Sequence, residues 1–157
     1  MPPPRPLPPR RPNTLRLRGF DYRTDGVYFV TVCTHRREAR LGTLVGGTFL
    51  PHRAGLLVLD TWRDLPCHYP GLALDAFAVL PDHVHAVVRL GGSAAPLFEV
   101  VRAFKTFSAR RINAHDGTAG CPVWQRSFHD RIVRSQREWN AVRAYVARNP
   151  WKAWVDT

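Results

Sequence analysis

The chain of 157 residues carries 23 Lys and Arg against 12 Asp and Glu, a net charge of +11, and 45% of its residues are hydrophobic. This length fits one folded domain, and the apolar content excludes a chain that is disordered throughout. The sequence has no run of about 18 apolar residues, which excludes a transmembrane helix. The charge indicates a polyanionic partner, either a nucleic acid or an acidic membrane surface.

The first twelve residues differ from the rest, because seven of them are Pro and three are Arg. Proline fixes φ and removes a backbone donor, so we expect a disordered leader over 1–12 and one folded domain over 13–157. An arm that touches DNA phosphates is the alternative. A secretory signal would have an apolar stretch behind its basic residues, and none follows these arginines. Three cysteines without CxxC spacing indicate a reducing compartment.

Apolar periodicity and turn residues predict the elements in chain order. Runs of β-branched and aromatic residues indicate strands, apolar residues at helical spacing indicate helices, and Gly, Pro and Asp mark turns. We expect a strand over 27–33, a hairpin over 41–50, a helix over 55–65 closed by Pro66, strands over 72–80 and 84–90, a helix over 96–113, a strand within 123–133 and a helix over 136–148.

The last helix has the clearest start signal, since Ser135 followed by Glu138 is a capping-box pattern. Pro150 should stop this helix. Adjacent strands with helices between them predict an α+β fold, an antiparallel sheet with helices packed on it.

The first candidate site is the His83-Val84-His85 pattern in a predicted strand. Residues i and i+2 of a strand project from one face, so both imidazoles should point the same way while Val84 enters the core on the other face. Histidine is a common metal ligand, and the pair could share one cation. The pattern also fits two unrelated strand histidines. Asp82 should face away from the pair.

A second candidate is Tyr145, with Asn149 four residues later on the same predicted helix. Residues four apart stack on one side of a helix, so a phenol and a carboxamide would be neighbours. A phenol needs activation to act as a nucleophile near neutral pH, and a nearby cation could polarise the phosphate that it attacks. The alternative is that Tyr145 edges the core and Asn149 caps the helix.

Basic residues interleaved with aromatic ones form a third candidate, because cations hold phosphates and rings stack on unpaired bases. An ordinary exposed strand with a solvated basic face explains the same pattern. The candidate nucleic-acid contacts are Lys105, Arg110, Arg111, Trp124, Arg126, Arg131 and Arg134.

Several segments in this order resemble the REP-associated tyrosine transposases, relatives of the single-tyrosine insertion-sequence transposases in the His-hydrophobic-His (HUH) endonuclease superfamily. The resemblance covers nearly the whole chain after residue 12. The matching segments are 15–22, 26–34, 79–85, 104–108, 123–128 and 145–150.

This resemblance implies a ferredoxin-like core, with the histidine pair on a central strand and the tyrosine on a C-terminal helix. It implies cleavage and rejoining of single-stranded DNA beside hairpins through a covalent 5′-phosphotyrosine. By position, Tyr145 would be the nucleophile, and His83, His85 and Asn149 would hold a divalent ion, Mg²⁺ or Mn²⁺. The expected partner is single-stranded or hairpin DNA, without a membrane, in the bacterial cytoplasm near the nucleoid. Monomer and homodimer both stay open.

The chain departs from this pattern after its Trp-Gln-Arg segment, where members often carry tyrosines and this sequence has Phe128 and His129. Two further functions are therefore weighed. One is a catalytically silent module that binds hairpin nucleic acid. The other is a zinc hydrolase built on the histidine pair, which would need a third protein ligand that the sequence does not offer nearby.

Overall fold

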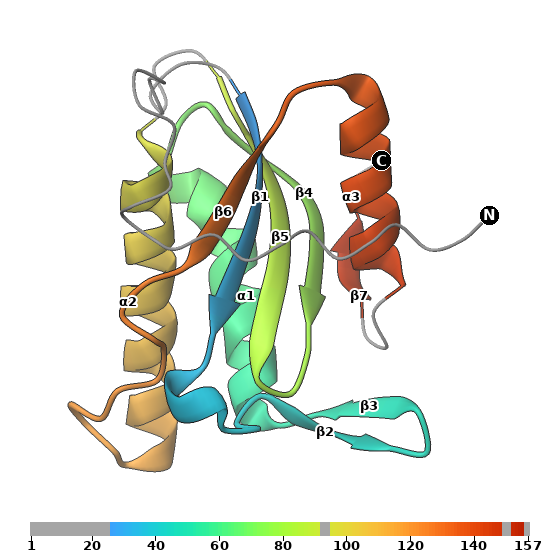
Figure 1. Cartoon of the computed structure of the whole chain (residues 1–157). Coiled ribbons are helices and arrows are strands. Elements are labelled where there is room, and N and C mark those ends of the chain that lie inside the picture. Colours follow the sequence, from blue (N-terminus) through green and yellow to red (C-terminus); the bar gives the residue numbers. More distant parts are fainter. Residues whose placement is uncertain (1–25, 92–94, 149–151, 156–157) are drawn as a thin grey trace.

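The computed structural model describes residues 26–91, 95–148 and 152–155 (Figure 1). The predicted leader and Asn149 lie outside these residues. In chain order the elements are β1 (Gly26–Cys33), η1 (His35–Arg37), β2 (Gly42–Val45), β3 (Thr48–Pro51), α1 (Arg53–His68), β4 (Leu72–Val79), β5 (His83–Leu90), α2 (Leu97–Asp116), β6 (His129–Val133), α3 (Gln136–Ala147) and β7 (Lys152–Val155).

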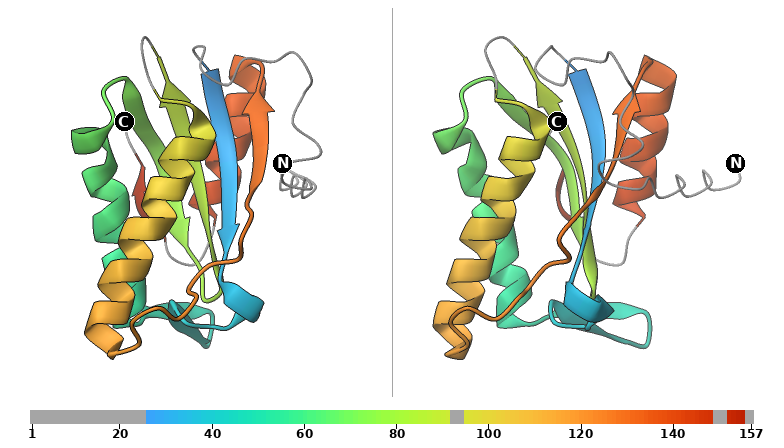
Figure 2. Two further views of the ribbon diagram at one scale, coloured as in Figure 1. Left: turned by 90° about the vertical axis from the view of Figure 1, so that its left-hand side faces the viewer. Right: turned by 60° about the vertical axis from the view of Figure 1, so that its left-hand side comes forward.

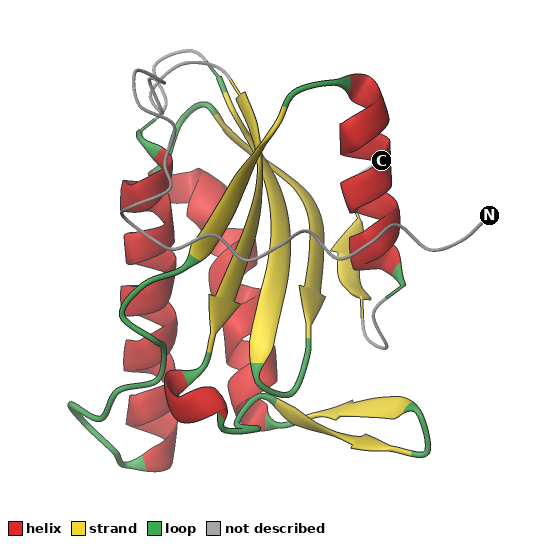
Figure 3. Ribbon diagram, in the orientation of Figure 1, coloured by secondary structure: helices red, strands yellow, loops and turns green. Residues whose placement is uncertain are grey.

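Five strands form one antiparallel sheet in the order β6-β1-β5-β4-β7, and β2 pairs with β3 in a separate hairpin (Figure 3). The succession β1-α1-β4-β5-α2-β6, with β1 and β5 at the centre of its four strands, is the ferredoxin-like arrangement. The predicted fold class is confirmed. The hairpin is an insertion between β1 and α1, while α3 and β7 extend the unit at its C-terminal end.

Helices cover both faces of the sheet. In Figure 2, α1 and α2 lie on one side and α3 on the other. The larger core lies under α1 and α2, where Trp62 stacks on Phe77 with ring centroids 4.7 Å apart. A smaller core under α3 includes Val87, Val142 and Val146. Burial of these apolar side chains is the main force that holds the three layers together.

Strand β5 divides its side chains between the two cores, as the alternation predicted. Val84 and Ala86 enter the core under α1 and α2. His83, His85 and Val87 face α3, since strand neighbours alternate. The candidate histidine pair therefore lies on the face of the sheet that α3 covers.

The predicted end of the first helix was wrong. Helix α1 continues through Pro66 to His68, and the Tyr69 amide bonds to the carbonyl of Leu65. Proline lacks one amide hydrogen, but in the last turn this costs a single hydrogen bond, and buried Trp62 and Leu65 hold the helix in place. The final strand lies within the predicted range 123–133 as β6, and Trp124 earlier in that range makes only an isolated bridge to Thr34.

Helix α3 starts at the predicted cap, where the hydroxyl of Ser135 accepts a hydrogen bond from the Glu138 amide. The Glu138 carboxylate bonds to the Arg134 amide and to Arg131 Nε rather than to the Ser135 amide of a full capping box. Strand β7, which pairs with β4, was not predicted from the sequence. None of the helices in the described residues is long and apolar enough to span a membrane.

Candidate active site

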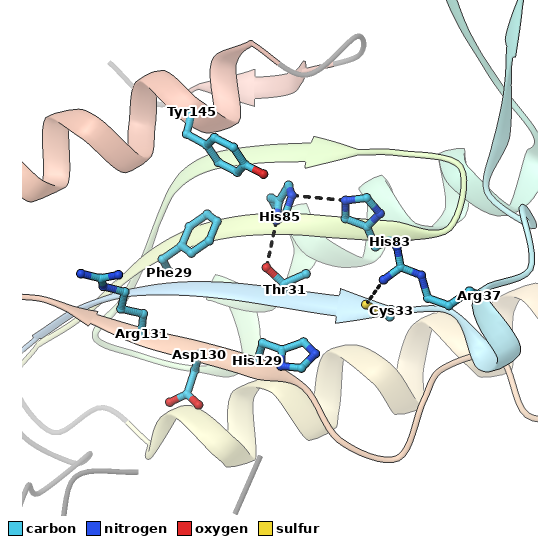
Figure 4. Close-up of a pocket in the computed structure, with 10 residues that line it drawn as sticks. All are labelled: Phe29, Thr31, Cys33, Arg37, His83, His85, His129, Asp130, Arg131 and Tyr145. Atoms are coloured by element: carbon cyan, nitrogen blue, oxygen red, sulfur yellow. Dashed lines mark hydrogen bonds between the residues drawn. The ribbon is translucent and has the colours of Figure 1, made fainter. Parts of the chain in front are cut away.

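A pocket of about 190 Å³ opens between α3 and the sheet near the start of β5. Figure 4 shows its walls, which come from β1, η1, β5, β6 and α3. The lining residues are Phe29, Thr31, Cys33, Arg37, His83, His85, His129, Asp130, Arg131 and Tyr145. Two of the three sequence candidates, the histidine pair and the tyrosine, therefore meet in one pocket.

The imidazoles of His83 and His85 converge, with their Nε2 atoms 3.2 Å apart. Strand alternation puts both rings on one face of β5, and the sheet register places Thr31 of β1 beside His85. Two neighbouring ligand atoms on one divalent ion are roughly 3 Å apart when the metal–nitrogen bonds are about 2.1 Å long. The spacing of the two nitrogens thus fits a shared metal ion.

The other ring nitrogen of each histidine has its own partner. Nδ1 of His83 donates to Oδ1 of Asp82 at 2.7 Å, and Nδ1 of His85 lies 2.9 Å from Oγ1 of Thr31. Such partners fix ring orientation in metal sites and leave Nε2 free for the ion. The expectation that Asp82 faces away is wrong, because Asp82 lies in the turn before β5, where strand alternation does not apply.

Both histidines are held neutral. Burial lowers the pKa of His83, although the Asp82 carboxylate opposes this effect. Burial, with smaller contributions from His83 and Arg37, lowers the pKa of His85 to about 3. An imidazole must be unprotonated to bind a metal ion, so the environment favours the ligand form near neutral pH.

The Tyr145 side chain projects from α3 toward the histidine pair (Figure 4). Its ring centroid lies 5.3 Å from that of His85 and 6.0 Å from that of Phe29, both in edge-on arrangements. The phenol therefore lies on the pocket wall and points into it, which is compatible with attack on a phosphate bound beside the two imidazoles.

Buried Asp75 of β4 anchors α3 above the pocket. Its carboxylate accepts a hydrogen bond from Trp139 Nε1 and pairs with Arg143 Nε at 3.0 Å. Val142 and Val146 pack into the core beneath the same helix. These contacts fix the position and rotation of α3 next to Tyr145.

The donor set fits a divalent ion that accepts nitrogen ligands. No third His, Cys, Asp or Glu joins His83 and His85 in the part of the chain that the structure describes. The two imidazoles would leave further positions for substrate oxygens or water, and Mn²⁺ accepts such a mixture more readily than Mg²⁺. A three-ligand zinc hydrolase site has no support among these residues.

The candidate nucleic-acid contacts are not gathered around the pocket. Lys105, Arg110 and Arg111 lie on α2, on the far side of the sheet. Lys105 donates to the Arg126 carbonyl at 2.8 Å, and Arg111 pairs with Asp64 of α1 at 2.8 Å. These bonds give Lys105 and Arg111 a structural role within the fold.

Trp124 is a buried residue, only 6% exposed, and its Nε1 donates to Ser108 Oγ at 2.9 Å, so in this structure its ring presents no open face for base stacking. Arg126 and Arg134 are exposed on either side of β6. Arg131 lines the pocket and pairs with Glu138 at 3.0 Å. Of the predicted set, Arg131 is the residue that the fold brings to the pocket.

The sequence reasoning missed Thr31 and Arg37 among the pocket residues, and it missed Asp82 as the partner of His83. Thr31 could have been found from strand pairing, since a residue opposite a candidate ligand shares its face. Arg37 had no such signal, because it lies in an irregular turn that only tertiary structure places beside β5.

Comparisons with known proteins agree with this geometry. Residues 66–149 match the model of the family described as IS200-like transposases. A protein of Haemophilus influenzae described only as uncharacterised is 22% identical over 162 aligned residues, with 87% of each chain covered.

Two solved structures have the same fold. A REP-associated tyrosine transposase bound to a REP hairpin matches with a TM-score of 0.64 and 19% identity, over 87% of this chain and 73% of that one. A Deinococcus radiodurans R1 protein assigned to the transposases matches with a TM-score of 0.54 and 22% identity, over 85% of this chain and 96% of that one.

Proposed function

The chain belongs to the family of IS200-like transposases, and we propose that it is a metal-dependent strand transferase that cuts and rejoins single-stranded DNA beside hairpins. The observation that carries the proposal is the meeting of Tyr145 with the converging His83 and His85 in one pocket of one chain. Its structural neighbour bound to a REP hairpin supports DNA hairpins as the substrate.

In the proposed reaction, the Tyr145 oxygen attacks the phosphorus of a DNA phosphodiester. A bond forms from the tyrosine oxygen to phosphorus, the bond from phosphorus to the 3′-oxygen breaks, and the phenolic proton passes to solvent. The leaving 3′-oxygen takes up a proton and becomes a 3′-hydroxyl. One phosphodiester replaces another, so rejoining by attack of a 3′-hydroxyl needs no ATP.

His83 and His85 would hold the divalent ion, with Asn149 as the further ligand that the family resemblance assigns. When bound, the ion supplies positive charge that polarises the phosphate and stabilises the charge that develops on its oxygens. Asp82 and Thr31 keep the two imidazoles oriented. Phe29 lines the pocket, where its ring stacks on His85, and it belongs with Val87 to the core under α3.

The test uses purified protein and labelled DNA that carries the hairpin and single-stranded flank next to its own gene. With Mn²⁺ or Mg²⁺, the wild type should form a covalent adduct that migrates slowly on a denaturing gel. Tyr145→Phe should abolish the adduct, because the described pocket residues include no second phenol and the Thr31 hydroxyl is bonded to His85. Tyr69→Phe is the matched control, since Tyr69 packs against the core under α1 and α2, and it should leave the adduct unchanged.

Adducts that persist in Tyr145→Phe would overturn the assignment of the nucleophile. Tight binding of the hairpin with neither adduct nor nicking in both metals would favour the alternative function, a silent binding module.

A further inference from the structure

Arg37 is the pocket residue that the proposed reaction does not yet use. Its guanidinium lies beside His83 at the mouth of the pocket (Figure 4), and 53% of the side chain is exposed. Arg37 belongs to η1, directly after β1, and therefore approaches the histidine pair from the end of the neighbouring strand.

The backbone at this point is unusual. Arg36 and Arg37 both have φ of 56°, the left-handed region that residues with a Cβ rarely adopt. Strained backbone that persists in a fold is concentrated at functional sites, where it aims a side chain. Here the turn delivers the Arg37 guanidinium to the pocket, while the side chain of Arg36 is exposed and does not line it.

Two anchors hold the guanidinium in a defined orientation. Nε donates to Oδ2 of Asp82 at 3.0 Å, and Nη1 donates to Sγ of Cys33 at 3.0 Å. Asp82 uses its other oxygen for Nδ1 of His83. One carboxylate therefore fixes both the imidazole and the guanidinium, so the two groups keep a constant spacing.

Arginine has five N–H donors, and these contacts use two of them. Both N–H groups of Nη2 and the second N–H of Nη1 bond to no residue in the described part of the chain, which leaves donors on two nitrogens for a ligand at the pocket. A planar guanidinium with free donors is the group that best matches two oxygens of a phosphate. Because it is fixed before substrate arrives, it loses little freedom on binding.

We propose that Arg37 is a catalytic residue that binds the phosphate that Tyr145 attacks. Its guanidinium would donate hydrogen bonds to the non-bridging oxygens from the side of η1. This proposal rests on the proposed function for the identity of that phosphate. The histidine pair and Arg37 would then hold the phosphate from two sides, with Tyr145 above it. Contacts to hairpin phosphates elsewhere position the DNA but do not act at the reacting atom.

The test replaces single phosphates of the flank by neutral methylphosphonates and measures binding of each hairpin in a Tyr145→Phe background with EDTA present, where no chemistry occurs and no metal ion contacts the phosphate. One neutral linkage should weaken binding about tenfold, because a charge-assisted hydrogen bond is lost there. Arg37→Ala should weaken binding of the unmodified hairpin by the same factor and abolish the penalty at that single linkage. Arg37→Gln, which keeps the length and polarity of the side chain, should behave in the same way.

Arg36→Ala is the matched control, since it removes the same charge from the neighbouring residue of the same turn. It should keep the full penalty at that linkage, and circular dichroism should show that all variants are folded. A penalty that persists in Arg37→Ala, or that disappears equally in Arg36→Ala, would overturn the proposal.

The outcome for Arg37 is separate from the outcome for strand transfer. In proteins with Tyr145 intact, nicking at the linkage whose binding penalty depends on Arg37 supports both proposals. If such a linkage exists but is not nicked with either metal, strand transfer is contradicted and the contact of Arg37 with that phosphate still holds. If nicking occurs at a linkage whose penalty does not depend on Arg37, only the role of Arg37 is contradicted.

Discussion

Convergence of His83 and His85 is the residue-level feature that follows most directly from the sequence. Period-2 alternation in a strand is enough to place both rings on one face. Their outer partners could not be predicted in the same way. Thr31 meets His85 only through the register of β1 and β5, which are 54 residues apart at this point. Asp82 turns toward His83 because it lies in a turn.

The orientation of His85 by Thr31 gives a prediction about metal binding. Thr31→Val keeps the β-branched shape and removes the hydroxyl, so Mn²⁺ affinity should fall about 10- to 100-fold, the usual effect of losing an outer partner of a metal ligand. His85→Ala should lower it further. Titration calorimetry with Mn²⁺ measures both. His129→Ala, in the same pocket but on β6, is the control and should bind Mn²⁺ like the wild type.

Equal Mn²⁺ affinity in the wild type and His85→Ala would show that the pair is not the metal site. Equal Mn²⁺ affinity in the wild type and Thr31→Val would contradict the role of the Thr31 hydroxyl and leave the histidine pair as the metal site.

At the level of elements, the existence of α3 was predictable and its docking was not. Apolar periodicity and the Ser135 cap mark the helix in the sequence. Its anchor, Asp75, lies 64 residues before Trp139, at a register shift in β4 that no local pattern signals. Strand β7 was missed because four residues are too few for a clear alternation.

The anchor predicts that stability and activity depend together on Asp75. Asp75→Asn removes the charged acceptor that Arg143 and Trp139 share, and the free energy of unfolding should fall by about 1.5–3 kcal/mol. Denaturant unfolding measures this. Adduct formation should also fall, because the docking of α3 positions Tyr145.

The control is Asp64→Asn, which breaks the exposed pair with Arg111 between α1 and α2. Its free energy of unfolding should change by less than about 1 kcal/mol, with adduct formation unchanged. Similar losses of adduct in both variants would mean that Asp75 has no specific effect on Tyr145.

For the whole molecule, composition indicated the kind of partner but not the surface that meets it. The net charge of +11 favours a polyanion, and the family places DNA in that role. Yet Lys105 and Arg111 bond within the fold, on the side of the sheet away from the pocket. Hydrophobic patterning was enough to predict the sheet and its helices. Whether a given Lys or Arg bonds within the fold or stays available for DNA depends on its neighbours in the tertiary structure, which the sequence pattern does not show.

The two halves of the site, the histidine pair on β5 and the tyrosine on α3, meet within one chain. The proposed function depends on covalent attachment of DNA through Tyr145. Mass spectrometry of the trapped adduct identifies the residue that carries the nucleotide. After nuclease and protease digestion, we expect a nucleotide joined through its 5′-phosphate to the peptide that contains Tyr145, and a 3′-hydroxyl on the released DNA. Nicked DNA with no nucleotide on any peptide, or with the nucleotide on another residue, would contradict the tyrosine mechanism.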